Sequence, residues 1–305
     1  MNSGPFAHLN QEPKLPRVLP ESPVEAGTLL PPAFQFSQKT LQDYVDCARR
    51  FQLNTTQGIR WPAAESEPID EVEHFMEQGA QFHLLVQRYL NGVDQELLKP
   101  ADPLLARWWQ HFLENPPPDL PEAKRIPEVM LSMPVGAQRL VARFDLVALD
   151  PGERIVIADW KTSRSRPQRQ DLAARMQTRI YPFVMVEAGH HLFGGAIKPE
   201  QVEMIYWFAE HPTRPERFTY DSRQHQANHT LITGLIDDIL GRDPESIWPL
   251  TDERRHCRYC VYRSLCERGV KAGRLDSGTD DLDPTLAAGD ATLGFDLDDV
   301  DEIAF

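Results

Sequence analysis

The sequence R-I-V-I-A-D-W-K-T-S, residues 154–163, is an apolar run that ends in an acid, a tryptophan and a lysine. It predicts a β-strand, in which residues two apart point to the same face. One face then carries Ile155, Ile157, Asp159 and Lys161. The other face carries Val156, Ala158 and Trp160. A carboxylate and an ammonium group therefore emerge side by side from a buried strand, either as a structural ion pair or as part of a site that uses metal or substrate.

A second acid lies in the middle of the preceding predicted strand, Arg139–Leu149. That strand is expected to place five residues on one face: Val141, Arg143, Asp145, Val147 and Leu149. Residues 150–153 predict a turn, which makes the two strands a hairpin and lets Asp145 and Asp159 approach each other. Two carboxylates that share a site repel unless a divalent cation lies between them, and such oxygen ligands suit Mg²⁺ or Mn²⁺.

Two further residues are candidate metal ligands. His83 lies on the apolar face of a helix predicted for residues 70–91, which Gly92 ends. A lone histidine there is either a core residue or a ligand, and the two acids and the lysine elsewhere favour the ligand. Glu128, on the predicted strand Pro127–Met133, is either an auxiliary ligand or a solvated strand acid.

Two polar residues belong to a helix predicted for Arg169–Ala188. Gln177 and Tyr181 are four residues apart, so they share one face of that helix. They form either an ordinary polar helix face or a surface beside the metal site that touches the phosphates of a substrate. A strand at Val202–Ala209 and a helix at Ser222–Leu240 are predicted to follow.

Four short motifs resemble those of the PD-(D/E)XK nuclease superfamily, in its RecB-type branch, in their order and spacing. They are G-A-Q-F-H at Gly79–His83, R-F-D at Arg143–Asp145, D-W-K at Asp159–Lys161 and Q-T-R-I-Y at Gln177–Tyr181. The resemblance implies an α/β fold with a restriction-endonuclease-like core, in which helices flank a central mixed sheet. It also implies metal-dependent hydrolysis of DNA, as an exonuclease on single strands or ends in repair or recombination.

The resemblance assigns roles to single residues as well. The positions that match metal ligands are His83, Asp145 and Asp159. The expected catalytic group is Asp145, Asp159 and Lys161, of which the lysine activates or orients water. The residues expected to help hold the nucleic acid are Gln177 and Tyr181. Two alternatives stay open: a nuclease of CRISPR spacer acquisition, and a non-catalytic iron–sulfur scaffold that binds DNA.

The chain has four cysteines. Three of them form C-x2-C-x5-C at Cys257, Cys260 and Cys266, and Cys47 lies far upstream. A tetrahedral zinc ion or an iron–sulfur cluster needs four thiolates, and four unrelated thiols are the remaining alternative. One distant cysteine with a late triplet resembles the iron–sulfur nucleases of the RecB-type branch, including AddB and CRISPR-adaptation exonucleases. The resemblance implies a 4Fe–4S cluster that clamps the ends of the nuclease domain.

Composition divides the chain into three parts. Residues 1–36 are rich in proline and predict a disordered leader, and residues 37–275 are expected to form the nuclease domain that the cysteine cluster closes. Residues 276–305 hold ten acids and no lysine or arginine, which predicts a disordered acidic tail. The formal net charge of −14 falls to −4 without this tail, so the remainder can bind a polyanion through a local basic groove and divalent metal.

The tail ends D-D-V-D-E-I-A-F, which resembles the acidic, Phe-terminated tip of bacterial single-stranded-DNA-binding proteins, with Ala304 where that tip has proline. The tail is expected to recruit a helicase or another repair partner, to fold back over the basic groove, or only to solubilise the protein. No apolar run reaches the roughly 18 residues that span a membrane, and the N-terminus lacks signal-peptide features. The sequence therefore predicts a cytoplasmic protein without a membrane partner.

Overall fold

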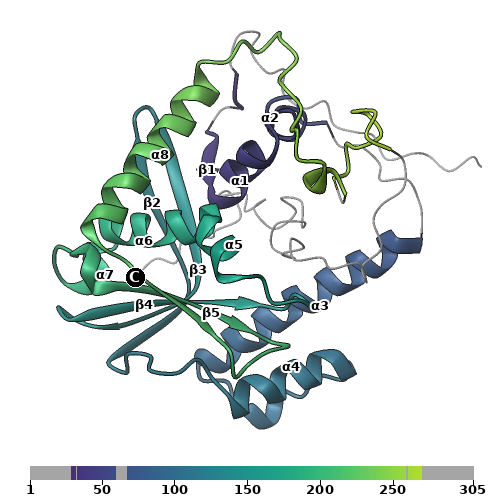
Figure 1. The fold of residues 1–305 in the computed structure, drawn as a ribbon. Coiled ribbons are helices and arrows are strands. Elements are labelled where there is room, and N and C mark those ends of the chain that lie inside the picture. The colour runs from purple at the N-terminus through teal and green to yellow at the C-terminus, as the bar shows by residue number, and fades with distance from the viewer. Residues whose placement is uncertain (1–28, 32, 60–66, 259, 270–305) are drawn as a thin grey trace, which may run out of the picture.

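The structure is a computed structural model that describes residues 29–31, 33–59, 67–258 and 260–269, with the side chains of residues 67–73 left out. The acidic tail and residues 1–28 of the predicted leader lie outside the described residues. The described chain forms a central sheet with helices on both faces, which is the α/β arrangement expected from the sequence (Figure 1).

The sheet has six strands in the order β1-β3-β4-β5-β6, and β2 pairs with β3 as well. The strands are β1 Gln35–Ser37, β2 Lys124–Val135, β3 Gln138–Asp150, β4 Arg154–Lys161, β5 Val202–Phe208 and β6 Glu216–Thr219. Parallel pairing joins β1 to β3 and β4 to β5, and the other pairs are antiparallel. The sheet is therefore mixed, as predicted.

Helices cover the two faces of the sheet. Figure 1 shows α3 and α4 on one side of the sheet and α6 and α8 on the other. The helices are α1 Gln38–Asp46, α2 Ala48–Phe51, α3 Glu67–Leu90, α4 Pro103–Glu114, α5 Arg169–Ala174, α6 Met176–Ala188, α7 His190–Phe193 and α8 Ser222–Leu240. A π-helical turn at Gln52–Thr56 extends α2, and short 3₁₀ turns occupy Gln95–Leu97, Pro199–Gln201 and Arg254–Cys257.

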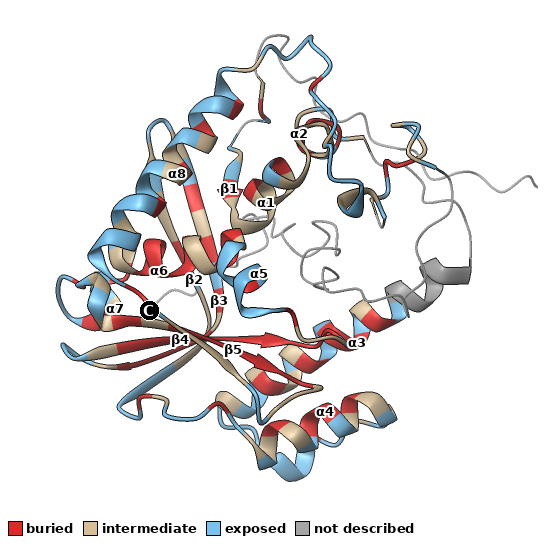
Figure 2. Cartoon of the chain, viewed as in Figure 1, coloured by how far each residue is buried: buried red, intermediate tan, exposed pale blue. Residues whose placement is uncertain are grey.

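Strand β4 separates two hydrophobic cores. Ile155 and Ile157 belong to the larger core, which α6 and α8 complete. Val156, Ala158 and Trp160 belong to the second core, which α3 and α4 complete. Figure 2 shows β4 and β5 buried along almost their whole length between these layers. The predicted alternation of β4 is confirmed, so Asp159 and Lys161 leave the sheet on the side of the larger core.

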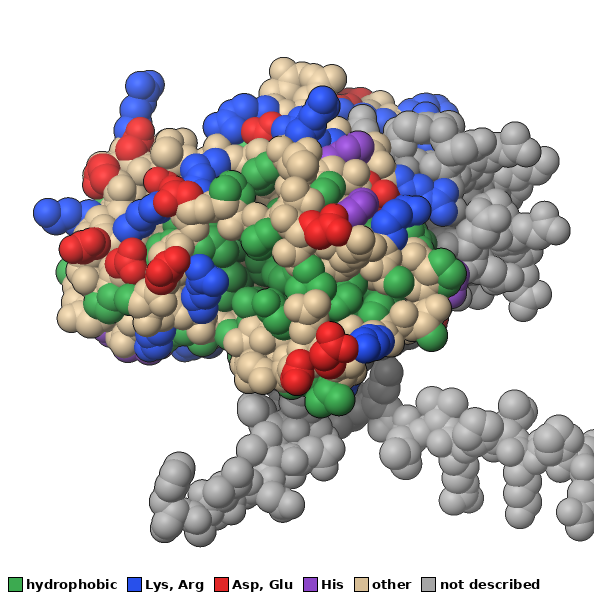
Figure 3. Space-filling model, turned by 90° about the horizontal axis from the view of Figure 1, so that it is seen from below, with side chains coloured by type: hydrophobic (Ala, Val, Ile, Leu, Met, Phe, Trp, Pro, Cys, Tyr) green, Lys and Arg blue, Asp and Glu red, His purple; other side chains and the backbone are tan. Residues whose placement is uncertain are grey.

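A cavity of about 190 Å³ lies on the α3–α4 side. Its lining includes Tyr89, Phe112, Pro116 and Trp160. Figure 3 shows this side of the molecule, where hydrophobic side chains surround a hollow. Because Trp160 faces away from Asp159 and Lys161 on β4, the cavity is separate from the acid and the lysine that the sequence singled out.

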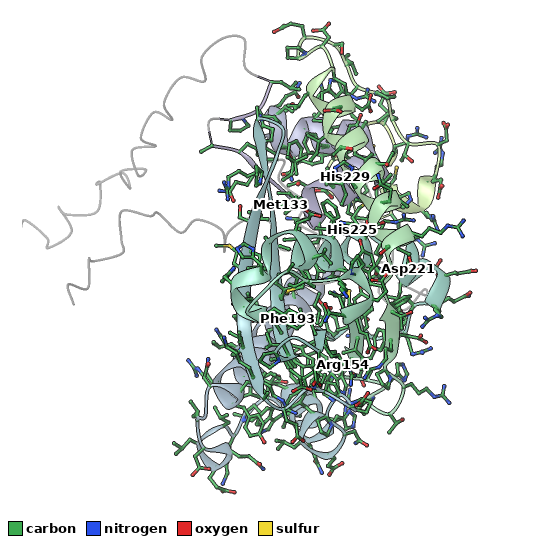
Figure 4. The ribbon with its side chains drawn as sticks, turned by 90° about the vertical axis from the view of Figure 1, so that its left-hand side faces the viewer. Met133, Arg154, Phe193, Asp221, His225 and His229 are labelled. Atoms are coloured by element: carbon green, nitrogen blue, oxygen red, sulfur yellow. The ribbon has the colours of Figure 1, made fainter. Side chains whose placement is uncertain are left out.

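Strands β2 and β3 form a long ribbon, along which Met133 lies well away from Arg154 at the start of β4 (Figure 4). One edge of β3 is shared by two shorter strands. β1 pairs with residues 139–141 and β4 pairs with residues 146–150. Residues 142–145 of β3 therefore form a gap on that edge, and Asp145 lies at its end.

Three details differ from the expected elements. The helix predicted for residues 169–188 is divided into α5 and α6, because Arg175 adopts an extended conformation with ψ of 141°. Strands β1 and β6 were not predicted, since three or four residues carry too little periodicity. Phe36 of β1 is fully buried, so the folded region begins before Ser37. Ser37 caps α1 by accepting a hydrogen bond of 3.2 Å from the Thr40 N–H.

Candidate functional site

Three ligand-type side chains from separate elements converge beside the gap in the sheet. His83 comes from α3, Glu128 from β2 and Asp145 from β3. One ligand atom from each lies within 4.8 Å of those from the other two. His83 and Asp145 therefore meet, as the sequence predicted, and their third partner is Glu128. The sequence left the role of Glu128 open between an auxiliary ligand and a solvated acid.

A local irregularity of the ribbon brings Glu128 and Asp145 together. The pairs Pro127↔Leu146 and Val129↔Phe144 are in register, whereas the residues between them, Glu128 and Asp145, are not paired. Glu128 has a φ of 56°, in the left-handed region that a residue with a side chain rarely adopts. Backbone strain of this kind is frequently found at functional sites.

The same irregularity changes the alternation of β3, which corrects one prediction. Val147 and Leu149 pack into the larger core together with Phe144, rather than lying on one face with Arg143 and Asp145. The predicted five-residue face therefore holds only as far as Asp145. Simple alternation could not anticipate this change, because it depends on how β2 and β3 pair around residue 128.

Asp145 is held by two contacts. Its Oδ1 lies 3.2 Å from Nδ1 of His83, and its Oδ2 accepts a hydrogen bond of 2.8 Å from the Trp160 N–H. Burial alone would raise the pKa of Asp145, but His83 and the Trp160 N–H hold it below its ordinary value. Burial opposes the charged form of His83, and the Asp145 carboxylate outweighs it and raises the pKa of His83 to about 9.

Glu128 has a different partner. Arg143 donates from Nε to its Oε2 over 2.7 Å, and 54% of the Arg143 side chain is exposed against 13% for Glu128. Burial, and then the neighbouring Asp145 carboxylate, raise the pKa of Glu128. The sequence placed Arg143 on the same strand face as Asp145 and in the R-F-D motif but gave it no role; its position two residues before Asp145 was the signal for a role at the site.

Asp159 and Lys161 form a second, buried group with Gln177. Lys161 Nζ lies 2.8 Å from Asp159 Oδ2 and donates to Gln177 Oε1 over 2.9 Å. Gln177 in turn donates from Nε2 to Asp159 Oδ1 over 2.5 Å, which closes a ring of three side chains. Asp159 and Lys161 are 3% and 2% exposed. In the described structure Asp159 is therefore bound to the lysine and the amide rather than grouped with His83, Glu128 and Asp145.

The buried group is nevertheless close to the three converging ligands. The Asp159 carboxylate contributes to raising the pKa of His83, and Lys161 contributes to lowering the pKa of Asp145. Tyr181, on the same helix face as Gln177, is buried and packs edge-on against Phe144 with ring centroids 4.9 Å apart. Burial, with Asp159 and Asp145 nearby, raises the pKa of Tyr181 well above its ordinary value.

The donors of this site suit a hard divalent cation. An imidazole and two carboxylates from rigid elements offer one nitrogen and several oxygens, which are ligands that Mn²⁺ and Mg²⁺ accept. Asp159 lies near His83 and is bound to Lys161 and Gln177. The residues present therefore fit a bound divalent cation, with His83, Glu128 and Asp145 as the group already assembled.

The four cysteines come from the beginning and the end of the described chain and lie close to one another. Cys47 lies between α1 and α2, while Cys257, Cys260 and Cys266 belong to the last described turns. The pKa of Cys260 is raised to about 11, mainly by burial and to a smaller extent by the neighbouring thiols of Cys266 and Cys47. Burial is also the main cause that raises the pKa of Cys266, and the neighbouring Cys47 and Cys257 thiols contribute to the same rise. All four cysteines are free thiols, and among the described residues no three of their sulfur atoms lie within 4.8 Å of one another.

Packing holds the upstream cysteine next to the triplet. The Arg49 N–H donates to the Pro249 carbonyl over 3.2 Å. Gln52 donates to the Ser246 carbonyl over 2.6 Å and accepts from the Trp248 N–H over 3.0 Å. The indole of Trp248 stacks on the ring of Phe51, with the two ring centroids 6.0 Å apart. The segments that carry the cysteines are therefore joined independently of any bound cofactor.

Comparison with known proteins gives the class to which this fold and site belong. Residues 35–267 match the model of the PD-(D/E)XK nuclease superfamily. The chain therefore belongs to this superfamily, whose members are nucleases that use divalent metals.

Two solved structures that resemble this chain have low sequence identity to it. A crystal structure of SSO0001 has 16% identity and a TM-score of 0.40, over 76% of this chain and 85% of that one. A protein from Eubacterium rectale, titled "Putative exonuclease", has 13% identity and a TM-score of 0.43, over 68% of this chain and 80% of that one. No curated protein matches. Among the described helices, none combines the length and apolar character that crossing a membrane requires.

Proposed function

We propose that this protein is a metal-dependent deoxyribonuclease, which acts as an exonuclease on single-stranded DNA or DNA ends in repair or recombination. The observation that supports the proposal is the convergence of His83, Glu128 and Asp145 beside a buried Asp159–Lys161 pair. Membership of the nuclease superfamily supports the reaction class, and the RecB-type motifs support the choice of DNA and of ends.

The proposed mechanism divides the site into two groups. His83, Glu128 and Asp145 would hold a divalent cation, and Asp159, which lies beside them and pairs with Lys161, would be the further acidic ligand. The chemistry that such a cation supplies is charge neutralisation on the phosphodiester and activation of water. Lys161 donates from Nζ to the attacking water or to the phosphate and so offsets charge that builds up on the phosphate.

Gln177 is a positioning residue in this scheme. Its amide oxygen accepts from Lys161 and its amide nitrogen donates to Asp159, so it orients both side chains at once. Burying an ammonium group with a carboxylate is costly unless further hydrogen bonds complete the pair, and the amide supplies them. Direct contact of Gln177 and Tyr181 with nucleic acid stays a prediction, since both side chains are buried in the described structure.

The test is digestion of end-labelled single-stranded DNA with Mn²⁺ or Mg²⁺. Lys161→Ala and Asp145→Asn should lower the rate by a factor of roughly 10² to 10⁴, because each removes a group that acts on the charge of the transition state. Lys124→Ala, an exposed lysine of β2, is the matched control and should digest at the wild-type rate. Equal digestion by wild type and Lys161→Ala would exclude this site as the catalytic one.

We also propose that Cys47, Cys257, Cys260 and Cys266 bind a 4Fe–4S cluster of structural function. Four neighbouring thiols are a ligand set for zinc or for iron–sulfur. A zinc ion with Zn–S bonds of about 2.3 Å needs sulfur atoms about 3.8 Å apart. Among the described residues no three of these sulfur atoms lie within 4.8 Å of one another, which favours the larger cluster over a zinc ion.

The cluster is tested by metal analysis of protein purified without oxygen. Wild type should contain about four iron atoms per chain, with visible absorbance, and little zinc. Cys47→Ser should lose both, because one ligand in four is removed. One zinc per chain and no iron, or full cluster absorbance in Cys47→Ser, would contradict the assignment.

The acidic tail, which lies outside the described residues, is proposed to recruit a helicase or another repair partner. The proposal is supported by its ten acids, the absence of basic residues in it and its terminal Phe305. Deleting residues 276–305 should leave digestion of single-stranded DNA unchanged and abolish co-purification of the partner. A tail that serves only to solubilise the protein would leave both unchanged.

A further inference from the structure

One exposed face of the β2–β3 ribbon leads to the metal centre. Along β3, the side chains of Leu140, Ala142 and Phe144 are buried, and the residues between them are more exposed. Arg139 and Arg143 therefore share a face with Asp145. At about 3.4 Å per residue, Arg143 lies about 7 Å and Arg139 about 20 Å from Asp145 along the strand.

The contact between Arg143 and Glu128 joins this face to the metal centre. It is a single Nε–Oε2 bond of 2.7 Å, made by a side chain that is more than half exposed. A guanidinium carries five N–H donors in a planar fork that matches phosphate oxygens, so this bond uses only one of them. An ion pair with an exposed partner contributes little net stability and can exchange.

Glu128 has two competing uses. Its carboxylate neutralises Arg143, and it is also one of the three ligand-type groups of the candidate metal centre. A divalent cation at that centre would attract the same carboxylate and repel the guanidinium. Binding of the cation therefore weakens the Arg143–Glu128 pair, while it attracts a phosphate to the same place.

We propose that Arg143 binds a backbone phosphate of the nucleic acid next to the metal centre, and that it exchanges Glu128 for this phosphate when the divalent cation binds. Arg139 extends the same path away from the centre. The inference rests on the proposed function and adds to it a coupling between metal and nucleic acid through one arginine. In the metal-free protein Glu128 keeps Arg143 from the phosphate.

The experiment measures binding of a fluorescein-labelled oligothymidylate by anisotropy, with Ca²⁺ as the divalent cation and with EDTA. Arg143→Gln should weaken binding about five- to tenfold with Ca²⁺ and change it little with EDTA. With Ca²⁺ the slope of log K against log salt should fall by about 0.7, the value for one phosphate contact on a single strand. Equal affinity and equal slope for wild type and Arg143→Gln would overturn the inference.

Arg107→Gln is the matched control. Arg107 is 53% exposed and pairs with Glu210 over 2.6 Å, so its exposure and ion pair closely resemble those of Arg143. It lies on α4, away from the ribbon. Its replacement should leave the affinity and the salt slope at wild-type values. If Arg107→Gln weakened binding as much as Arg143→Gln does, the effect would be one of general charge, and the inference would fail.

The exchange itself is tested with Glu128→Gln. Without metal, this substitution should release Arg143, so that adding Arg143→Gln in the same chain weakens DNA binding about five- to tenfold. In wild type the same arginine substitution should cost little under EDTA. A cost of Arg143→Gln that is equal in the two backgrounds would show that Glu128 does not control the arginine.

Calorimetric titration with Mn²⁺, without DNA, separates failure of this inference from failure of the proposed function. Mn²⁺ should bind wild type and Arg143→Gln and should not bind Asp145→Asn. If Mn²⁺ binds in this way while Arg143→Gln keeps wild-type DNA affinity, only the exchange is wrong. If wild type does not bind Mn²⁺, both the proposed metal centre and the proposed exchange at Arg143 are wrong.

Discussion

At the scale of single residues, the site is a group of acids that cations hold together. Glu128, Asp145 and Asp159 lie close enough to influence one another and their neighbours. Arg143 pairs with Glu128, His83 with Asp145, and Lys161 with Asp159. Each of the three carboxylates is therefore paired with a side chain that can carry a positive charge, which offsets the cost of burying it.

The His83–Asp145 pair predicts a pH dependence of stability. The pKa of His83 is about 9 in the folded protein against an ordinary 6.5, so folding favours its protonated form. Its stabilisation is therefore complete below about pH 6.5 and is lost as the pH rises towards 9, by an amount on the order of 3 kcal/mol. Asp145 stays ionised across this window because its pKa is lowered.

The measurement compares urea unfolding of wild type and His83→Gln, both with EDTA, at several pH values. The difference in unfolding free energy should be largest near pH 6 and should shrink towards pH 9. A difference that stays constant with pH would mean that the histidine is neutral in the folded protein and contributes only by packing.

At the scale of elements, the connection after α6 depends on a glycine. A methyl group on Gly189 would lie 2.5 Å from the Met185 carbonyl oxygen and 2.6 Å from the Met185 sulfur. The carbonyl belongs to the helix backbone and cannot move without disturbing α6. Because α6 carries Gln177 and Tyr181, the geometry of this helix end matters for the site.

Two glycine substitutions should therefore have opposite effects on the free energy of unfolding. Gly189→Ala should lower it by about 1–3 kcal/mol, because the added methyl group overpacks the helix end. Gly234→Ala, in the exposed middle of α8 where a Cβ meets nothing within 4 Å, should raise it by about 0.5–1 kcal/mol through helix propensity. Thermal unfolding checks both, and the prediction fails if the two changes shift Tm in the same direction.

At the scale of the whole molecule, residues far apart in the sequence join the start of the fold to its end. Tyr44 of α1 donates to Asp238 of α8 and accepts from Arg242. Trp248 stacks on Phe51 and is 1% exposed, just before the cysteine triplet begins. The cysteines close the same junction, so a bound cluster and the aromatic packing should stabilise each other.

This linkage is tested by Trp248→Ala. The substitution should lower the free energy of unfolding by about 3–5 kcal/mol, as for other large buried aromatic residues, and should reduce the iron content of the purified protein. Ile247→Ala, at a neighbouring residue that is 81% exposed, is the matched control and should change stability by less than about 0.5 kcal/mol. A Trp248→Ala protein with full iron content would show that the triplet is placed without this packing.

The sequence by itself determined the elements that have a clear period. The alternation around Asp159 predicted β4 and its two faces, and helical spacing predicted the helix that carries His83. The order of four motifs predicted the superfamily, which the family match confirms. These features are local, since they depend on residues within a few positions of one another.

Only the tertiary structure decided how the side chains combine. Glu128 joins His83 and Asp145 because β2 and β3 leave residues 128 and 145 unpaired, and alternation cannot encode that irregularity. Asp159 is bound to Lys161 and Gln177 because α6, which packs against β2, β3 and β5, places Gln177 beside the end of β4. Contacts between residues far apart in the chain depend on the register of strands and the packing of helices, which no single segment specifies.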